Sequence, residues 1–199
     1  DYRRPESDEP GEQFRLYEMG GMSHRQTWMH LVLIDGVGIE ATEKQRCANP
    51  LNSFPYNPTI SMALDHLLRW VEDDVPPPRA ERIELTGQVG DDDVAIARDD
   101  HGNVRGGLRS TTLDVPVATH QALNEPRDLD RDLTPGSCLV YGSQLDFPCD
   151  ELASLYGDRE AYVDAVDDRL GELIEDGWLL EQFADELHQQ AATIDGFEG

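Results

Sequence analysis

A histidine that follows a pair of glycines is the residue of this sequence best placed for chemistry. Residues 14 to 24, FRLYEMGGMSH, are typical of a short strand that breaks at Gly20 and Gly21 and then delivers His24. Glycine adopts backbone angles that are closed to other residues, so the chain can turn sharply here. A neutral imidazole takes up and returns a proton near pH 7. We therefore predict that His24 is a catalytic general base, which needs a nucleophile within hydrogen-bonding reach.

No serine of the chain has the surroundings of an activated nucleophile. The nearest one, Ser23, lies in the run Gly21-Met-Ser-His-Arg25, where arginine replaces the last glycine of the Gly-x-Ser-x-Gly turn. That turn needs small residues on both sides of the serine. A base adjacent in sequence also rarely reaches its nucleophile, because triad partners come from separate loops. The sequence therefore predicts a base whose nucleophile lies elsewhere.

Among the other histidines, only His120 is a second candidate for catalysis, and a weak one. It follows a β-prone run and precedes a polar loop. We predict structural or surface roles for the remaining four, which are His30, His66, His101 and His188.

Neither the histidines nor the cysteines have the spacing of a metal site. A site made of His24, His30 and Asp35 is a minor alternative, because this spacing fits no His-Glu-x-x-His motif. The three cysteines fit no Cys-x-x-Cys pattern, and we expect no metal and no cofactor. Cys138 and Cys149 are the nearest pair for one disulfide, with free thiols as the alternative, so cysteine usage leaves the localisation unknown.

A helix is predicted after the histidine region. Asn57-Pro58 favours a helix start, since asparagine caps free N–H groups and proline fits the first helical position. The triple proline at residues 76 to 78 ends the helix and marks an internal boundary. Apolar side chains at three- and four-residue intervals predict one buried face, which consists of Ile60, Leu64, Leu67, Leu68 and Val71.

Short β-prone runs and then helices are predicted beyond the prolines. Residues 99 to 103, DDHGN, are typical of a hairpin turn, and residues 121 to 137 of a loop. An Asp158 cap and an apolar stripe predict a helix that ends at Gly177. The predicted β-prone runs are residues 82 to 86, 94 to 97 and 115 to 119, and the other predicted helices are residues 150 to 156 and 181 to 190. The apolar run 28 to 34 fits either a strand or a turn of helix.

Acidic residues dominate the composition. Asp and Glu number 41 against 16 Lys and Arg, which gives a formal net charge of -25. Such a chain repels nucleic acid, and no apolar run is long enough to span a bilayer. Self-repulsion opposes compactness unless salt screens it, so we hypothesise a halophilic protein, with an ordinary acidic surface as the alternative. The sequence begins at Asp1 and not at an initiator Met, which is typical of a processing site or a truncation.

Several segments together resemble a known family. They are residues 3 to 8 (RRPESD), 14 to 18 (FRLYE), 21 to 24 (GMSH), 49 to 53 (NPLNS), 67 to 71 (LLRWV), 76 to 78 (PPP), 100 to 109 (DHGNVRGGLR), 114 to 118 (DVPVA) and 155 to 163 (LYGDREAYV). In order and spacing, the chain from about residue 3 to 190 is similar to the C-terminal half of α/β-hydrolase domain-containing proteins, a group of serine esterases.

The resemblance implies an α/β fold of which this chain is the C-terminal part. Residues 1 to 78 would hold the last core strand, the histidine loop and the last core helix, and residues 79 to 199 an α+β extension. In that fold the triad runs nucleophile, acid, histidine along the chain. His24 would therefore be the base, with the serine and the acid upstream of Asp1. Glu6 or Asp8 is an alternative acid.

The same resemblance implies a small-molecule ester as substrate and the upstream part of the protein as partner. Asn52 and Tyr56 follow the histidine loop and are candidates for lining its pocket, and residues 106 to 109 for a wall or lid. Each of these also has a plain structural interpretation. The competing hypothesis for the whole chain is a noncatalytic structural or interaction module derived from a hydrolase fold.

The acidic composition generates the first prediction. Dialysis from molar to dilute salt lengthens the Debye length from about 3 Å to about 30 Å, which leaves the carboxylates free to repel one another. We expect the far-ultraviolet circular dichroism to show unfolding during this dialysis and recovery when salt is restored. A spectrum that is indifferent to salt would contradict the halophilic hypothesis.

Overall fold

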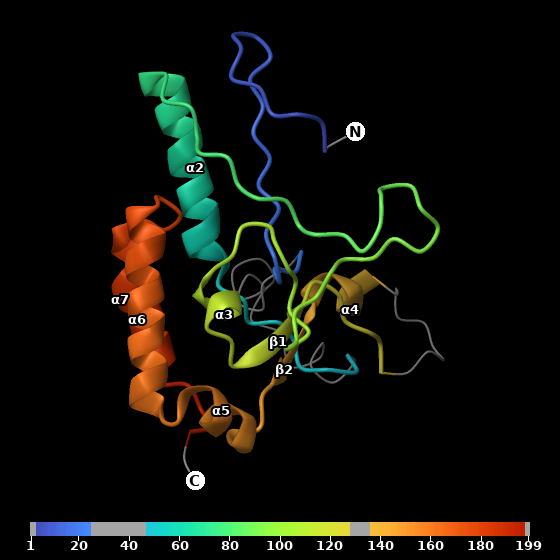
Figure 1. Cartoon of the computed structure of the whole chain (residues 1–199), viewed down its shortest axis with the longest axis vertical. Coiled ribbons are helices and arrows are strands. Elements are labelled where there is room, and N and C mark those ends of the chain that lie inside the picture. Colours follow the sequence, from blue (N-terminus) through green and yellow to red (C-terminus); the bar gives the residue numbers. More distant parts are fainter. Residues whose placement is uncertain (1–2, 25–46, 128–135, 198–199) are drawn as a thin grey trace, which may run out of the picture.

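A two-stranded antiparallel sheet lies in the middle of the molecule, and most of the helices surround it (Figure 1). The structure is a computed structural model that describes residues 3 to 24, 47 to 127 and 136 to 197. Its elements are α2 (Tyr56–Asp73), α3 (Thr111–Asp114), β1 (Ala118–Gln121), α4 (Gly136–Tyr141), β2 (Ser143–Asp146), α5 (Cys149–Tyr156), α6 (Arg159–Glu175), the 3-10 turn η2 (Glu181–Phe183) and α7 (Ala184–Ala192). No helix within these described ranges is long and apolar enough to cross a membrane.

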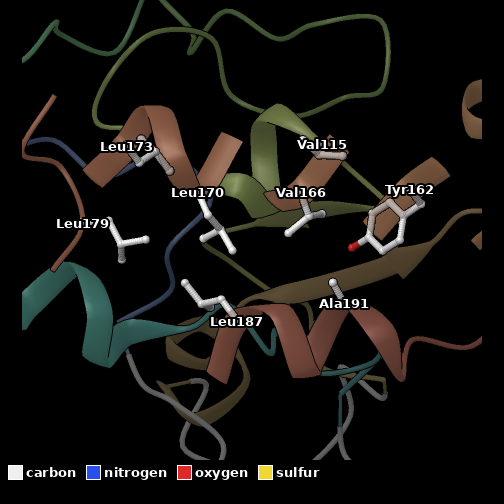
Figure 2. Close-up of a cluster of buried hydrophobic side chains, with 8 residues drawn as sticks. All are labelled: Val115, Tyr162, Val166, Leu170, Leu173, Leu179, Leu187 and Ala191. Carbon is white, nitrogen blue, oxygen red and sulfur yellow. The ribbon is translucent and has the colours of Figure 1, made fainter. Parts of the chain in front are cut away.

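The main core lies between α6 and α7, where the sequence prediction is confirmed. The Asp158 side chain caps α6 by accepting a hydrogen bond from the Ala161 N–H at 2.9 Å. Side chains of α6 at helical spacing then meet α7, α3 and the turn after Gly177 (Figure 2). The buried set consists of Val115, Tyr162, Val166, Leu170, Leu173, Leu179, Leu187 and Ala191.

Helix α2 forms in the predicted region, but it starts at Tyr56 with Pro55 as the N-cap residue, so the predicted cap by Asn57 was wrong. The helix also buries the opposite face. It ends at Asp73, before the prolines, and Asp74 closes it with a left-handed φ of 56°. The apolar stripe predicted to be buried is exposed, up to 76 % at Val71. The buried residues are Pro58, Met62, His66 and Trp70, which recur every four residues. The prediction was wrong because this second face, although it contains a histidine, has partners for both its apolar and its polar groups.

The polar atoms of His66, on the buried face of α2, have partners within the protein. Its Nδ1 lies 3.0 Å from the Tyr17 hydroxyl, which also donates to the Pro78 carbonyl at 3.0 Å. The indole of Trp178 packs edge-on against the same imidazole at 6.0 Å between centroids. Burial lowers the pKa of His66, so the ring is neutral near pH 7. The structural role predicted for this histidine is confirmed.

Most of the predicted strands are reduced to isolated bridges. Residues 14 to 19 pair only at their ends, where Phe14 bridges Ser7 and Met19 bridges Leu108. The runs at 82 to 86 and 94 to 97 also pair only through isolated bridges, which join Ile83 to Gly106 and Leu85 to Ile96. The turn at 99 to 103 is confirmed by the Gly102 N–H donating to the Asp99 carbonyl at 3.0 Å. Glycines with positive φ interrupt these ladders at residues 102, 106 and 107.

The remaining predictions have mixed outcomes. The run at 115 to 119 becomes a strand only from residue 118, as β1. The helices predicted at 150 to 156 and 181 to 190 are confirmed by α5 and by η2 with α7. The predicted loop 121 to 137 gives way to α4 at residue 136, and the apolar run 28 to 34 lies outside the described residues.

A buried disulfide joins two distant parts of the chain. Cys47 and Cys138 are bonded, although they are 91 positions apart in sequence, and both are at most 3 % exposed. Neither alternative from the sequence holds for Cys138, which is not a free thiol and does not pair with its nearest neighbour in sequence, Cys149. Cys149 is an exposed free thiol. Leu51 and Tyr141 pack around the bond, so it anchors the segment that leads into α2 against α4.

The disulfide generates the second prediction. Replacing Cys47 and Cys138 together with serine frees a loop of 91 residues in the unfolded state. The chain-entropy model gives a loss of about 4 to 5 kcal/mol in the free energy of unfolding. Urea unfolding at constant salt measures this loss, with Cys149→Ser as the control that should change little. Three titratable thiols in the denatured, unreduced wild type would contradict the pairing.

Candidate active site

The Gly20-Gly21 turn is held on three sides by buried groups. The Gly20 N–H donates to the Leu108 carbonyl at 3.2 Å, and the Leu108 N–H donates to the Glu18 carbonyl at 2.7 Å. Gly21 has a φ of 74°, and a Cβ there would lie 3.0 Å from the Leu113 side chain. The glycine break predicted from the sequence is therefore confirmed, and a side chain at Gly21 would be strained.

The Asn52 side chain holds this turn in place with a hydrogen bond. Its Nδ2 donates to the Gly21 carbonyl at 2.7 Å and to the Gln121 carbonyl at 3.2 Å. Its Oδ1 accepts from the Phe54 N–H at 3.0 Å and lies 2.9 Å from Nδ1 of His120. An amide side chain has two donor hydrogens and two acceptor positions, so all four are occupied by protein groups. Asn52 is 2 % exposed and links the turn to the end of β1.

Ser23 points inward from the same turn. It is 4 % exposed, and a Cβ on Gly142 would lie 2.7 Å from the Ser23 Cβ. Gly142 has a φ of 63°, which suits glycine and lets the chain before β2 approach this closely. Because Ser23 is enclosed between Gly142 and Tyr56, its burial agrees with the rejection of Ser23 as a nucleophile.

His24 is the first exposed residue after this buried turn. No residue in the described part of the chain forms a hydrogen bond with its imidazole, and the residues that follow it lie outside the described ranges. The ring is therefore presented at the surface from a rigid base. A general base in this position needs both its nucleophile and its orienting acid from other groups.

The two carboxylates considered as alternative acids are engaged elsewhere. Glu6 accepts hydrogen bonds from the Leu16 N–H at 3.2 Å and from Arg82 at 3.3 Å. Asp8 pairs with Arg15 at 2.6 Å and with Arg79 at 2.9 Å. The Arg79 and Arg15 guanidinium groups hold the pKa of Asp8 below its usual value. These ion pairs tie the N-terminal segment to the residues that follow the triple proline.

Asn52 and Tyr56 both line an open cleft of about 640 Å³. Its wall includes Phe54, Phe147 and Leu152, and its acidic residues are Asp146, Glu186 and Asp195. The volume lies within the range of small-molecule sites. His24 is not among the described residues that line this cleft. The link between them is indirect, because Asn52 lines the cleft and also bonds Gly21, three residues before His24.

The Tyr56 hydroxyl is a buried polar group whose hydrogen-bonding capacity is not satisfied by the described residues. Its Oη is buried, and no described group lies in hydrogen-bonding geometry with it. Burial raises the pKa of Tyr56, and the neighbouring Ser23 hydroxyl acts in the opposite direction. A buried hydroxyl without a partner is costly, and a bound molecule could supply the missing hydrogen bond.

His120, the weak second candidate from the sequence, is 3 % exposed. Burial lowers its pKa to about 4, so the imidazole is neutral at pH 7. Phe54 packs edge-on against the ring at 6.2 Å between centroids. In the sequence, only its position at the end of a β-prone run singled out His120. Its hydrogen bond with Asn52 could not be foreseen, because the two residues are 68 positions apart in the chain.

The other candidates fall into two groups. Residues 106 to 109 hold the glycine turn through Leu108, and the Arg109 Nε donates to Asp114 at 2.5 Å, so their contacts are structural. His30 and Asp35 of the metal alternative lie outside the described residues. In the ranges that the structure does describe, no cluster of three or more His, Cys, Asp or Glu is placed to hold a metal ion.

Comparison with known proteins identifies the family. The model of the α/β hydrolase domain family matches residues 1 to 189. The chain therefore belongs to the α/β hydrolase domain family, as the resemblance of its segments predicted. No curated protein and no solved structure gives a significant match.

The contacts of Asn52 generate the third prediction. Asn52→Ala removes the partners of two buried carbonyls, one N–H and one imidazole nitrogen, and each unsatisfied group costs about 1 to 3 kcal/mol. We expect the free energy of unfolding to fall by roughly 3 kcal/mol or more in urea. Asn57→Ala, at an exposed position five residues further along, is the control and should change it by less than about 0.5 kcal/mol. Equal effects of the two substitutions would contradict the role given to Asn52.

Proposed function

We propose that this chain is the C-terminal part of a serine ester hydrolase in which His24 is the general base. The observation that carries the proposal is an exposed histidine on a buried, fully bonded glycine turn, in a chain that belongs to a hydrolase family. A rigid support of this kind suits a catalytic group, because a small misplacement of the reacting atoms costs much of the rate.

The nucleophile and the acid are proposed to lie upstream. The described residues supply neither to His24, and Glu6 and Asp8 are held by arginines. Residues 1 to 78 would complete the hydrolase core and residues 79 to 199 would form the extension. The exposed apolar face of α2 supports this division, because an apolar helix face favours contact with another packed layer.

The mechanism follows from these roles. An upstream serine would attack the ester carbonyl while His24 takes its proton, and His24 would return that proton to the leaving alcohol. An upstream carboxylate would orient the imidazole. Water would then enter by the same proton transfers and release the acid, so atoms and charges balance over the cycle.

The cleft lined by Asn52 and Tyr56 is the proposed place for part of the substrate. The Tyr56 hydroxyl would hydrogen-bond it directly, since the neighbouring Ser23 hydroxyl acts on its pKa but no described residue bonds it in good geometry. Asn52 would act mainly by holding the turn, because its own hydrogen-bonding positions are filled. No nucleic acid and no cofactor enters this proposal.

A noncatalytic module is the second candidate. It is favoured by one observation, which is that no described residue pairs with the His24 imidazole. In that case the histidine would be a relic, and the exposed face of α2 would serve an interaction only.

The fourth prediction separates the two candidates. In the complete protein, His24→Ala should lower kcat/KM for a nitrophenyl ester by roughly a thousandfold or more, because a triad without its base keeps only residual activity. His188→Ala is the matched control, since His188 lies on the outer side of α7 and pairs with Asp167 at 2.8 Å, and the activity of this variant should not change.

A fluorophosphonate probe gives an independent measurement. It should label the complete protein on a serine upstream of residue 1 and leave the 199-residue chain unlabelled. A His24→Ala variant with wild-type activity would contradict the assignment of His24 as the base. If the complete protein neither reacts with the probe nor hydrolyses esters, the noncatalytic module is favoured.

A further inference from the structure

The tautomer of His120 follows from the contacts of Asn52. The Asn52 group that faces the Gly21 and Gln121 carbonyls must be the NH₂, because carbonyl oxygens only accept hydrogen bonds. Its other end is therefore the oxygen, which already accepts from the Phe54 N–H. An imidazole nitrogen 2.9 Å from that oxygen must donate, so Nδ1 of His120 carries the proton.

Nε2 of His120 is then a bare acceptor. In a neutral imidazole protonated at Nδ1, the other nitrogen has a lone pair and no hydrogen. Among the residues that the structure describes, none forms a hydrogen bond with this atom. The His120 residue is 3 % exposed, but Nε2 is not one of the side-chain atoms that are sealed off without a partner in the described ranges, which are the hydroxyls of Tyr56 and Ser110. An acceptor that keeps contact with open space and has no donor from the described protein groups is available to a donor on a bound molecule.

The ring faces a chamber that adjoins the cleft. His120 lines a space of about 110 Å³ whose other walls include Val115, Tyr162 and Val166 of the main core. Ser53, Val117 and Ile194 line both this chamber and the cleft of about 640 Å³, so the two are adjoining compartments. The inner compartment has apolar walls from the main core and polar residues such as Thr111, Thr112 and Gln190, and its described lining contains no carboxylate. It also contains the unpaired acceptor of His120.

The charges of the lining exclude one class of ligand. Asp146, Glu186 and Asp195 line the cleft, and no Lys, Arg or His is among the described residues of its wall. A carboxylate or phosphate would be repelled there. An ammonium group suits the acidic rim but not the chamber, because the described lining of the chamber contains no carboxylate and a buried charge without a counter-ion is costly.

We propose that the chamber and the cleft bind a neutral alcohol, whose hydroxyl group donates a hydrogen bond to Nε2 of His120 and whose apolar body extends past Val117 and Ile194 into the cleft. This deepens the proposed function, since the alcohol would be a hydroxyl-bearing part of the ester substrate. Binding itself needs no hydrolysis, so failure of the hydrolase assignment leaves this test intact.

The test compares ligands of equal size on the 199-residue chain. 1-Hexanol and methyl pentyl ether have the same atoms, but only hexanol donates a hydrogen bond. Titration followed by heteronuclear NMR should give a dissociation constant about tenfold lower for hexanol, which corresponds to one net hydrogen bond of about 1.4 kcal/mol. Hexanoate should bind more weakly than either, because the rim is acidic.

A substitution isolates the acceptor. His120→Asn keeps an N–H near the position of Nδ1, where it can still donate to Asn52, and deletes Nε2. We expect this variant to bind hexanol no better than the ether, with the ether affinity unchanged. His188→Asn, on the exposed part of α7, is the matched control and should keep the tenfold preference.

A measurement on the wild type covers the case in which His120→Asn does not fold. The ¹⁵N resonance of Nε2 should be that of an unprotonated imidazole nitrogen and should move upfield with hexanol but not with the ether. A protonated Nε2, or equal affinities for hexanol and the ether, would overturn the proposal and leave water as the occupant of the chamber.

Discussion

Four hydrogen bonds to one amide side chain hold together the parts of this protein that matter most for its chemistry. Asn52 joins the Gly21 turn, the end of β1 at Gln121, the backbone of Phe54 and the ring of His120. These groups come from segments far apart in the sequence. Because a buried amide is costly unless all its positions are satisfied, the four partners must be in place together. The glycine turn, the start of α2 and β1 therefore depend on one another.

Buried residues form the glycine turn, and the residue that follows it is exposed to solvent. The turn residues Gly20, Gly21 and Ser23 are buried, whereas His24 immediately after them is exposed. The same network fixes the tautomer of His120 and leaves its other nitrogen as an acceptor at the wall of a chamber. Asn52 therefore has a different relation to each of the two histidines, His24 and His120. It supports the backbone that carries the first and it bonds the ring of the second.

Sequence patterns predicted a feature of this chain correctly where that feature depends on residues close together in the sequence. The Asp158 cap, the end of α2 before the prolines and the turn at residues 99 to 103 were predicted well, because each depends on neighbours within a few residues. The buried face of α2 was predicted wrongly. Two faces of that helix carry apolar side chains, and only the distant partners Tyr17 and Trp178 decide which is buried. The runs at 82 to 86 and 94 to 97 do pair with each other, through Leu85 and Ile96, but only as an isolated bridge. Continuous strands did not form, because the length of a β ladder depends on the pairing along its partner as well as on the local pattern.

The amino-acid sequence alone determined the family, the glycine break before His24, the caps of α6 and the acidic character of the chain. These follow from residue types and short spacings, which act through local backbone preferences and summed charge. Tertiary structure decided that Cys47 pairs with Cys138, that Glu6 and Asp8 serve arginines, and that Asn52 lies between Gly21 and His120. Each of these contacts joins groups that are separated in the chain, or competes with another partner that the sequence makes equally available. Only the packing of the whole chain selects one of them, because burial makes an unpaired polar group too costly to leave.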